Sequence, residues 1–113
     1  MTNTLWEIVF YQDHRGRIPV IEFIDALPAM DQAKVYNALR LLREFGTILG
    51  MPHTRHIDGK LWELRPGGIR LFYFAYIGKR FVILHGYRKK STKASEREVK
   101  IALQRLDELL KEG

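Results

Sequence analysis

The sequence contains no cysteine, so it has neither a disulfide framework nor a thiolate that could act as a nucleophile or bind a metal ion. It also lacks an apolar run close to the roughly 20 residues that a membrane span requires. Residues 1–14 lack the basic start and the longer apolar stretch that are typical of a signal peptide. These absences lead us to expect a cytoplasmic protein that does not associate with a membrane.

Acidic residues are scarce in the middle third of the chain, where residues 55–93 contain only Asp58 and Glu63. A two-metal nuclease needs several carboxylates to hold its ions. His53 and His56 have a spacing compatible with a metal ion, but no cysteine or clear helix accompanies them. The sequence also has no GxxxxGK[ST] phosphate loop and no GxSxG motif. We therefore expect no metal site and no cofactor.

Positive charge, in contrast, is concentrated in the same segment. Residues 55–93 carry ten lysines and arginines, whereas the segments on either side each have a net charge of −1 and the whole chain has +6. Such a local excess is typical of proteins that bind polyanions. The pattern therefore favours a nucleic-acid partner. The alternative is a solvated basic surface that keeps the protein soluble.

The hydrophobic periodicity predicts a single α+β domain over residues 1–113. We expect strand, helix, helix, three strands and helix in this order, which gives a small, antiparallel-rich sheet with the helices packed on one face. The stretch 46–60 has no sustained period and is expected to be irregular. The expected elements are a strand at 4–11, helices that begin at Pro19 and near Asp31, strands at 61–65, 69–76 and 80–87, and a helix that follows Ser95.

Two predicted turns set the register of the three consecutive strands. If 66–69 and the pair Gly78-Lys79 are the connections, Arg65 lies opposite Arg70, and Arg70 lies opposite Tyr87. Because side chains alternate along a strand, two different faces result. The expected core face consists of Trp62, Leu64, Leu71, Tyr73, Ala75, Val82 and Leu84. The expected open face consists of Glu63, Arg65, Arg70, Phe72, Phe74, Ile83, His85 and Tyr87.

The candidate active site lies at one end of that open face. Arginine can hold a phosphate with two hydrogen bonds, and histidine and tyrosine can transfer protons. Without a metal ion, the natural route to cleavage uses the 2′-hydroxyl of RNA as the nucleophile. The candidate catalytic residues are Arg70, His85, Tyr87, Arg65 and Arg88. The candidate RNA-binding residues are Lys89, Lys90, Lys93, Lys60 and Arg55.

A structural interpretation of the same residues stays open. Like charges opposite one another, such as Arg65 and Arg70, are unfavourable in isolation. Either a bound anion or Glu63 must compensate for them, and Glu63 could simply pair with one of the two. Phe72, Phe74 and Ile83 could likewise belong to the core.

The segments LWELR, IRLFY and LHGYRKK, in this order and at this spacing, resemble the RelE/ParE superfamily of small bacterial toxins from type II toxin–antitoxin modules, and in particular its phage-derived HigB-like branch. The resemblance spans nearly the whole chain. It implies a RelE/ParE-like fold and a ribosome-dependent mRNA endonuclease that inhibits translation. It also implies a cognate antitoxin, expected to be of the helix-turn-helix type, as a partner besides the ribosome and mRNA.

On matching positions, the resemblance implies basic residues around the scissile phosphate at Arg65, Arg70, Arg88 and Lys89. The sequence departs from RelE in two respects. Leu61 and Glu63 stand where RelE has lysines, and no tyrosine follows Tyr87. The general acid and base therefore remain to be chosen among His85, Tyr87 and the group Lys89, Lys90 and Lys93.

Two other functions stay open at this stage. A gyrase inhibitor of the ParE branch would share the fold but need no proton transfer, so His85 and Tyr87 would be packing residues. A non-catalytic RNA-binding module would use the same basic face for affinity alone.

Overall fold

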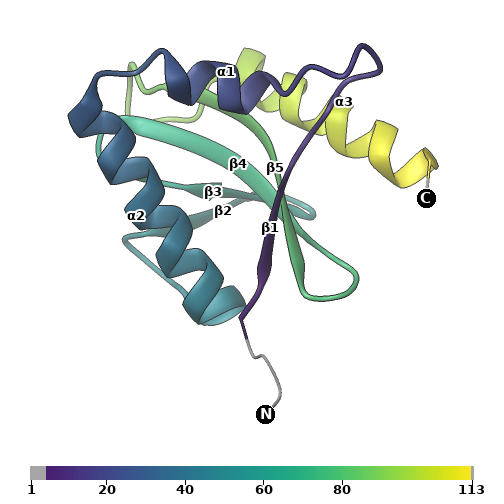
Figure 1. Cartoon of the computed structure of the whole chain (residues 1–113), viewed down its shortest axis with the longest axis horizontal. Coiled ribbons are helices and arrows are strands. Elements are labelled where there is room, and N and C mark those ends of the chain that lie inside the picture. The colour runs from purple at the N-terminus through teal and green to yellow at the C-terminus, as the bar shows by residue number, and fades with distance from the viewer. Residues whose placement is uncertain (1–4, 113) are drawn as a thin grey trace.

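The structure, a computed structural model, describes residues 5–112, so Thr4, where we expected the first strand to begin, lies outside the described residues. The described part of the chain forms five strands, three α-helices and one short 3-10 turn, η1 (Figure 1). The elements are β1 (Glu7–Phe10), α1 (Pro19–Asp25), α2 (Ala29–Phe45), η1 (Gly46–Ile48), β2 (Thr54–Asp58), β3 (Leu61–Leu64), β4 (Ile69–Tyr76), β5 (Arg80–Arg88) and α3 (Glu96–Glu112). None of the helices between residues 5 and 112 is both long enough and apolar enough to cross a membrane.

All five strands belong to one sheet in the order β1-β5-β4-β3-β2. β1 runs parallel to β5, and the other three pairs are antiparallel. This confirms the predicted α+β class and the antiparallel-rich sheet. β1 and β2 are the two edges of the sheet, so the three consecutive strands that we predicted lie between them.

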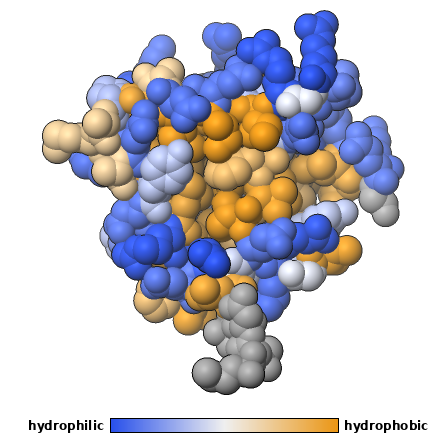
Figure 2. All heavy atoms as spheres, viewed as in Figure 1, coloured by the Kyte–Doolittle hydropathy of each residue, from blue (hydrophilic) through white to orange (hydrophobic). Residues whose placement is uncertain are grey.

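The expectation that the helices pack on one face is wrong. One apolar layer joins α1 and α2 to one face of the sheet, and a second layer joins α3 to the opposite face. Figure 2 shows part of the first layer as a hydrophobic area between α1, α2 and β1, surrounded by hydrophilic side chains. The sheet is buried on both faces because its central strands carry apolar residues at consecutive positions, as Ile69–Tyr76 illustrates.

The register of β4 and β5 explains this difference. The predicted pairs of Arg70 with Tyr87 and of Phe72 with His85 are present, but the register then shifts by one residue, and Tyr73 pairs with Ile83. Such a bulge inverts the faces of the β5 residues beyond it, whereas β4 keeps its alternation. Ile83 therefore belongs to the α1/α2 layer, where we expected Val82 and Leu84, and these two pack under α3.

Two further details of the core differ from the prediction. The turn between β4 and β5 has three residues, Ile77 to Lys79, because Tyr76 pairs with Arg80. Trp62 and Ala75, which we expected in the core, are exposed. The core between α1 and β5 is tight at Gly86, where an added Cβ would lie 2.8 Å from Phe23 Cδ2.

The segment expected to be irregular contains β2. Thr54, Arg55 and His56 pair with β3, and the ladder then shifts before Asp58. The chain returns to β3 through Gly59, which has a positive φ of 55°. β2 therefore places Arg55 directly beside Glu63, a neighbour that the sequence did not predict.

Candidate functional site

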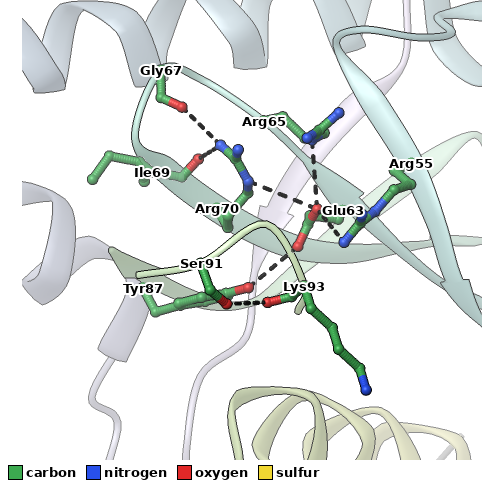
Figure 3. A network of polar contacts seen from close by, with 9 residues as sticks. All are labelled: Arg55, Glu63, Arg65, Gly67, Ile69, Arg70, Tyr87, Ser91 and Lys93. Carbon is green, nitrogen blue, oxygen red and sulfur yellow. Dashed lines mark hydrogen bonds and ion pairs between the residues drawn. The ribbon is translucent and has the colours of Figure 1, made fainter. Parts of the chain in front are cut away.

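The centre of the candidate site is the buried carboxylate of Glu63 on β3, which is 1% exposed. Its Oε1 lies 3.5 Å from Arg55 Nη2, 3.7 Å from Arg65 Nε and 3.8 Å from Arg70 Nε. Figure 3 shows the three guanidinium groups around this carboxylate, and Tyr87 approaches it from another direction. We call Arg55, Glu63, Arg65, Arg70 and Tyr87 the arginine cluster. Of the two possibilities left open above, Glu63 is the group that compensates for Arg65 and Arg70.

Arg70 is not on an open face, as we expected, but is only 6% exposed. Its Nη1 donates hydrogen bonds of 2.8 Å to the carbonyl oxygens of Gly67 and Ile69. The backbone N–H of Lys89 donates to the Gly68 carbonyl, which draws the chain after β5 against the same turn. Burial and the neighbouring charge of Arg65 lower the pKa of Arg70. The guanidinium group is thus held by the backbone on the side away from Glu63.

Tyr87 completes the cluster from β5. Its hydroxyl donates a hydrogen bond of 3.3 Å to Glu63 Oε2. Burial, together with the charge and the hydrogen bond of Glu63, raises the pKa of Tyr87 to about 12. The phenol therefore keeps its proton at neutral pH and donates it in the hydrogen bond to Glu63.

His85 lies beside the cluster, under the beginning of α3. Its Nε2 is 3.0 Å from Glu98 Oε1, and its Nδ1 is 3.5 Å from Arg105 Nη1. The ring stacks on Tyr87 with 6.1 Å between centroids. Burial lowers the pKa of His85, although the contact with Glu98 acts in the opposite direction. Both ring nitrogens thus face side chains of α3.

The segment that leaves β5 carries most of the exposed positive charge near the cluster. Arg88 is half exposed and forms an ion pair of 3.0 Å with Asp31 in the first turn of α2. Lys89, Lys90 and Lys93 are exposed. In Figure 3 the Lys93 side chain points away from Glu63. We call residues 88–95 the basic loop.

A groove runs on each side of the basic loop. The first lies between the loop and α1 and contains Tyr87 and Arg97. The second lies between β2 and the beginning of α3 and contains Arg55 and Lys100. Lys93 lines both grooves. The two grooves give an extended chain two paths along positively charged side chains.

The structure therefore gathers most of the predicted site residues but not all. Lys60 lies in the turn between β2 and β3, at the end of the sheet opposite Arg65. Sequence reasoning missed Arg97 and Lys100, which contribute to the grooves. Their spacing of three residues on a helix was a signal, because such residues share a face. Within residues 5–112, no group of three or more histidine, aspartate and glutamate side chains could hold a metal ion.

Comparison with known proteins identifies the family. The family model described as "Phage derived protein Gp49-like (DUF891)" matches residues 22–107, from within α1 to within α3. No curated protein matches the chain. The crystal structure of the isolated E. coli RelE toxin is similar over 89% of this chain and 98% of that chain, with 21% sequence identity and a TM-score of 0.47. The family match confirms the predicted relationship to a phage-derived family, whereas the name HigB-like stays a prediction. The chain belongs to the phage-derived Gp49-like family.

Proposed function

We propose that the protein is a RelE-type toxin that cuts ribosome-bound mRNA and is neutralised by a cognate antitoxin of the helix-turn-helix type. One observation carries the proposal, namely that three arginines gather around a single carboxylate beside an exposed basic loop. Three guanidinium groups and one carboxylate leave two positive charges uncompensated, which suits a phosphodiester. The family and the basic segment 55–93 support the same function.

The proposed reaction uses the 2′-hydroxyl of RNA and requires no metal ion. The 2′-oxygen attacks the adjacent phosphorus atom, and the bond from phosphorus to the 5′-oxygen breaks. The products are a 2′,3′-cyclic phosphate and a 5′-hydroxyl. Arg65 and Arg55, which reach the surface of the cluster, stabilise the charge that develops on the phosphoryl oxygens. Arg70 supports them from the interior, and Arg88, Lys89, Lys90 and Lys93 bind the flanking RNA.

Tyr87 is the proposed general acid. Its high pKa keeps the phenol protonated, so it can donate to the 5′-oxygen as the bond breaks. A lysine of the basic loop, in its neutral form, is the proposed acceptor of the 2′-hydroxyl proton. Because both nitrogens of His85 face α3, we favour a positioning role for this ring. His85→Gln should therefore lower the rate less than Tyr87→Phe, for which we expect a loss of roughly 10²–10⁴.

A gyrase inhibitor of the ParE type is the second candidate. The contacts of His85 with Glu98 and Arg105 favour it, because a gyrase inhibitor would use His85 only for packing. Induced expression distinguishes the two functions in the cytoplasm of a bacterial host. Rapid arrest of translation with cleaved mRNA supports the endonuclease, whereas DNA damage supports the gyrase inhibitor.

The test of the chemistry is primer extension on ribosome-bound mRNA with one 2′-deoxy substitution at the nucleotide 5′ to the cut. The substituted message should resist cleavage, because the nucleophile is missing. Arg65→Ala should lose a factor of roughly 10²–10³ in rate on unmodified mRNA, as for one donor to a developing oxyanion. Cleavage of the deoxy message at the normal rate would exclude the 2′-hydroxyl mechanism.

A further inference from the structure

Glu63 combines deep burial with incomplete hydrogen bonding. Its Oε1 and the Nε of Arg65 are both buried, and neither has a hydrogen-bond partner within the described part of the chain. The distances of 3.5–3.8 Å to the three guanidinium groups exceed the usual length of a charge-assisted hydrogen bond. Three arginines therefore surround the carboxylate, but none of them forms a short hydrogen bond with its Oε1.

This arrangement is a costly way to stabilise a fold. Removing a carboxylate from water costs several kcal/mol, and only good pairing geometry compensates for it. Glu63 nevertheless stands in the interior of the sheet, where it pairs with Phe72 of β4. The position between Arg55 and Arg65 suggests that Glu63 acts on those two side chains rather than on the core.

The three arginines are not equivalent. Arg70 has two hydrogen bonds to backbone carbonyls and is fixed in the interior. The side chains of Arg55 and Arg65 are 34% and 22% exposed, and each forms a long ion pair with Glu63. They come from neighbouring strands, where Arg55 pairs directly with Glu63. Two partly exposed guanidinium groups thus lie on the solvent side of one anion.

We infer that Glu63 is a positioning residue, the fixed counter-ion that holds Arg55 and Arg65 side by side so that both can stabilise the charge that develops on one phosphodiester of RNA as it is cut. This inference rests on the proposed function and adds the residue that orders its phosphate-binding pair. Glu63 itself does not meet the RNA, because it is 1% exposed. Its carboxylate also takes the hydrogen bond of Tyr87 and so fixes the phenol beside the same pair.

The test compares Glu63→Gln with a matched control, Glu108→Gln. Glu108 accepts a hydrogen bond of 2.7 Å from Tyr11 under the other end of α3, so the two form a second tyrosine–glutamate pair outside the arginine cluster. The probe is a short single-stranded RNA with methylated 2′-hydroxyls, which the proposed reaction cannot cut. Affinity is measured by fluorescence anisotropy, and cleavage by primer extension on unmodified, ribosome-bound mRNA.

We expect Glu63→Gln to separate binding from cleavage. Affinity for the methylated RNA should stay the same or increase, because one negative charge is removed. The cleavage rate should fall by roughly 10², since the two guanidinium groups lose their common anchor. Glu63→Asp keeps the charge and should restore part of the rate. Glu108→Gln should change neither quantity. Cleavage at the normal rate in Glu63→Gln, or a matching loss of affinity and rate, would overturn the inference.

A second measurement does not depend on cleavage. In nuclear magnetic resonance spectra, Arg55 and Arg65 should each show a separate Nε–H signal that shifts when the methylated RNA is added. Both signals should broaden or disappear in Glu63→Gln but not in Glu108→Gln. If the protein cuts no RNA, the proposed function fails, yet these signals still decide whether Glu63 orders the pair. Sharp, unchanged signals in Glu63→Gln would exclude the counter-ion role.

Discussion

The face of the sheet under α1 and α2 and the face under α3 are built from the same strands, but they are buried in different ways. Under α1 and α2, Leu64, Leu71 and Ile83 belong to an apolar layer that contains no buried charged side chain among the described residues. Under α3, the apolar layer includes Leu61, Phe72 and Phe74. At the end of that face nearest the basic loop, charged side chains replace the apolar ones. This change from apolar to charged side chains occurs where α3 no longer covers the sheet.

The beginning of α3 explains where the change occurs. Glu98 in its first turn contacts His85, so the helix covers the sheet only up to that row. The next row along the strands contains Arg65, Arg70 and Tyr87, and the basic loop rather than a helix lies beside it. The basic loop offers few apolar side chains. The strand residues that it covers therefore form ion pairs and hydrogen bonds instead of apolar contacts. The comparison shows that the arginine cluster is the end of the α3 face where the basic loop, and not a helix, lies over the sheet.

The largest effect that we expect comes from Phe72→Ala, on the covered part of the α3 face. Phe72 is fully buried and packs beside His85 and Tyr87. Its loss should lower the free energy of unfolding by about 3–5 kcal/mol in urea denaturation. Leu103→Ala should cost less, because Leu103 is only partly buried. If Phe72→Ala costs less than Leu103→Ala, α3 does not cover this face as described.

The next effect concerns Arg70, at the uncovered end. Arg70→Ala leaves the carbonyl oxygens of Gly67 and Ile69 without their donor and removes one positive charge from Glu63. It should cost about 1–3 kcal/mol in the same experiment. Arg88→Ala is the matched control, since its exposed ion pair with Asp31 contributes about 0–1 kcal/mol. Equal costs for the two variants would mean that Arg70 is as solvated as Arg88.

The sequence predicted the positions of the helices and strands better than it predicted which face of the sheet each side chain lies on. The hydrophobic periods located α1, α2, β3, β4 and β5, because each has a strong pattern. The bulge between Phe72 and Tyr73 could not be predicted, because strand patterns on a sheet covered on both sides are apolar at consecutive positions. A regular ladder without the bulge places Val82 and Leu84 under α1 and α2, whereas in the structure both residues pack under α3.

The candidate site was predicted only in part, because one of its strands has a weak sequence pattern. The pairing of Arg65 and Arg70 with Glu63 follows from the turn at 66–69, which its two glycines make recognisable. The sequence predicts Arg55 as an RNA-binding residue but not as a member of the cluster, because it gives little sign of β2. β2 is a short, polar edge strand, and such strands carry a weak pattern. The dipeptide Asp58-Gly59 before β3 was the available signal for a hairpin.

A smaller effect concerns the exposed lysines, which should change affinity and not stability. Changing Lys89, Lys90 and Lys93 to glutamate should reduce the salt dependence of RNA binding, by about 0.7 in slope for each phosphate that the protein no longer neutralises. The free energy of unfolding should stay nearly the same, because all three side chains are exposed. Lys60→Glu, at the other end of the sheet, reports whether the RNA extends that far. An unchanged slope in the triple variant would place the RNA away from the basic loop.

The smallest effect that we expect concerns pH and the boundary between the two kinds of burial. His85 is held by Glu98 and Arg105 of α3, and Phe72 and Tyr87 are its neighbours on the strands. Burial lowers its pKa in the folded protein, so the unfolded chain binds the proton more readily. The stabilising contribution of the neutral ring is therefore present above the ordinary histidine pKa of about 6.5 and is lost as the pH falls below it.

Urea denaturation at a series of pH values between neutral and mildly acidic conditions measures this contribution. The free energy of unfolding of the native protein should fall more steeply with acid than that of His85→Gln, because glutamine does not titrate. His56→Gln is the control, since His56 is exposed at the edge strand β2. If the free energy of unfolding depends on pH in the same way in the native protein and in His85→Gln, then protonation of His85 does not destabilise the fold. The beginning of α3 would in that case not seal the apolar layer, and the boundary between core and arginine cluster would have to lie closer to Phe74.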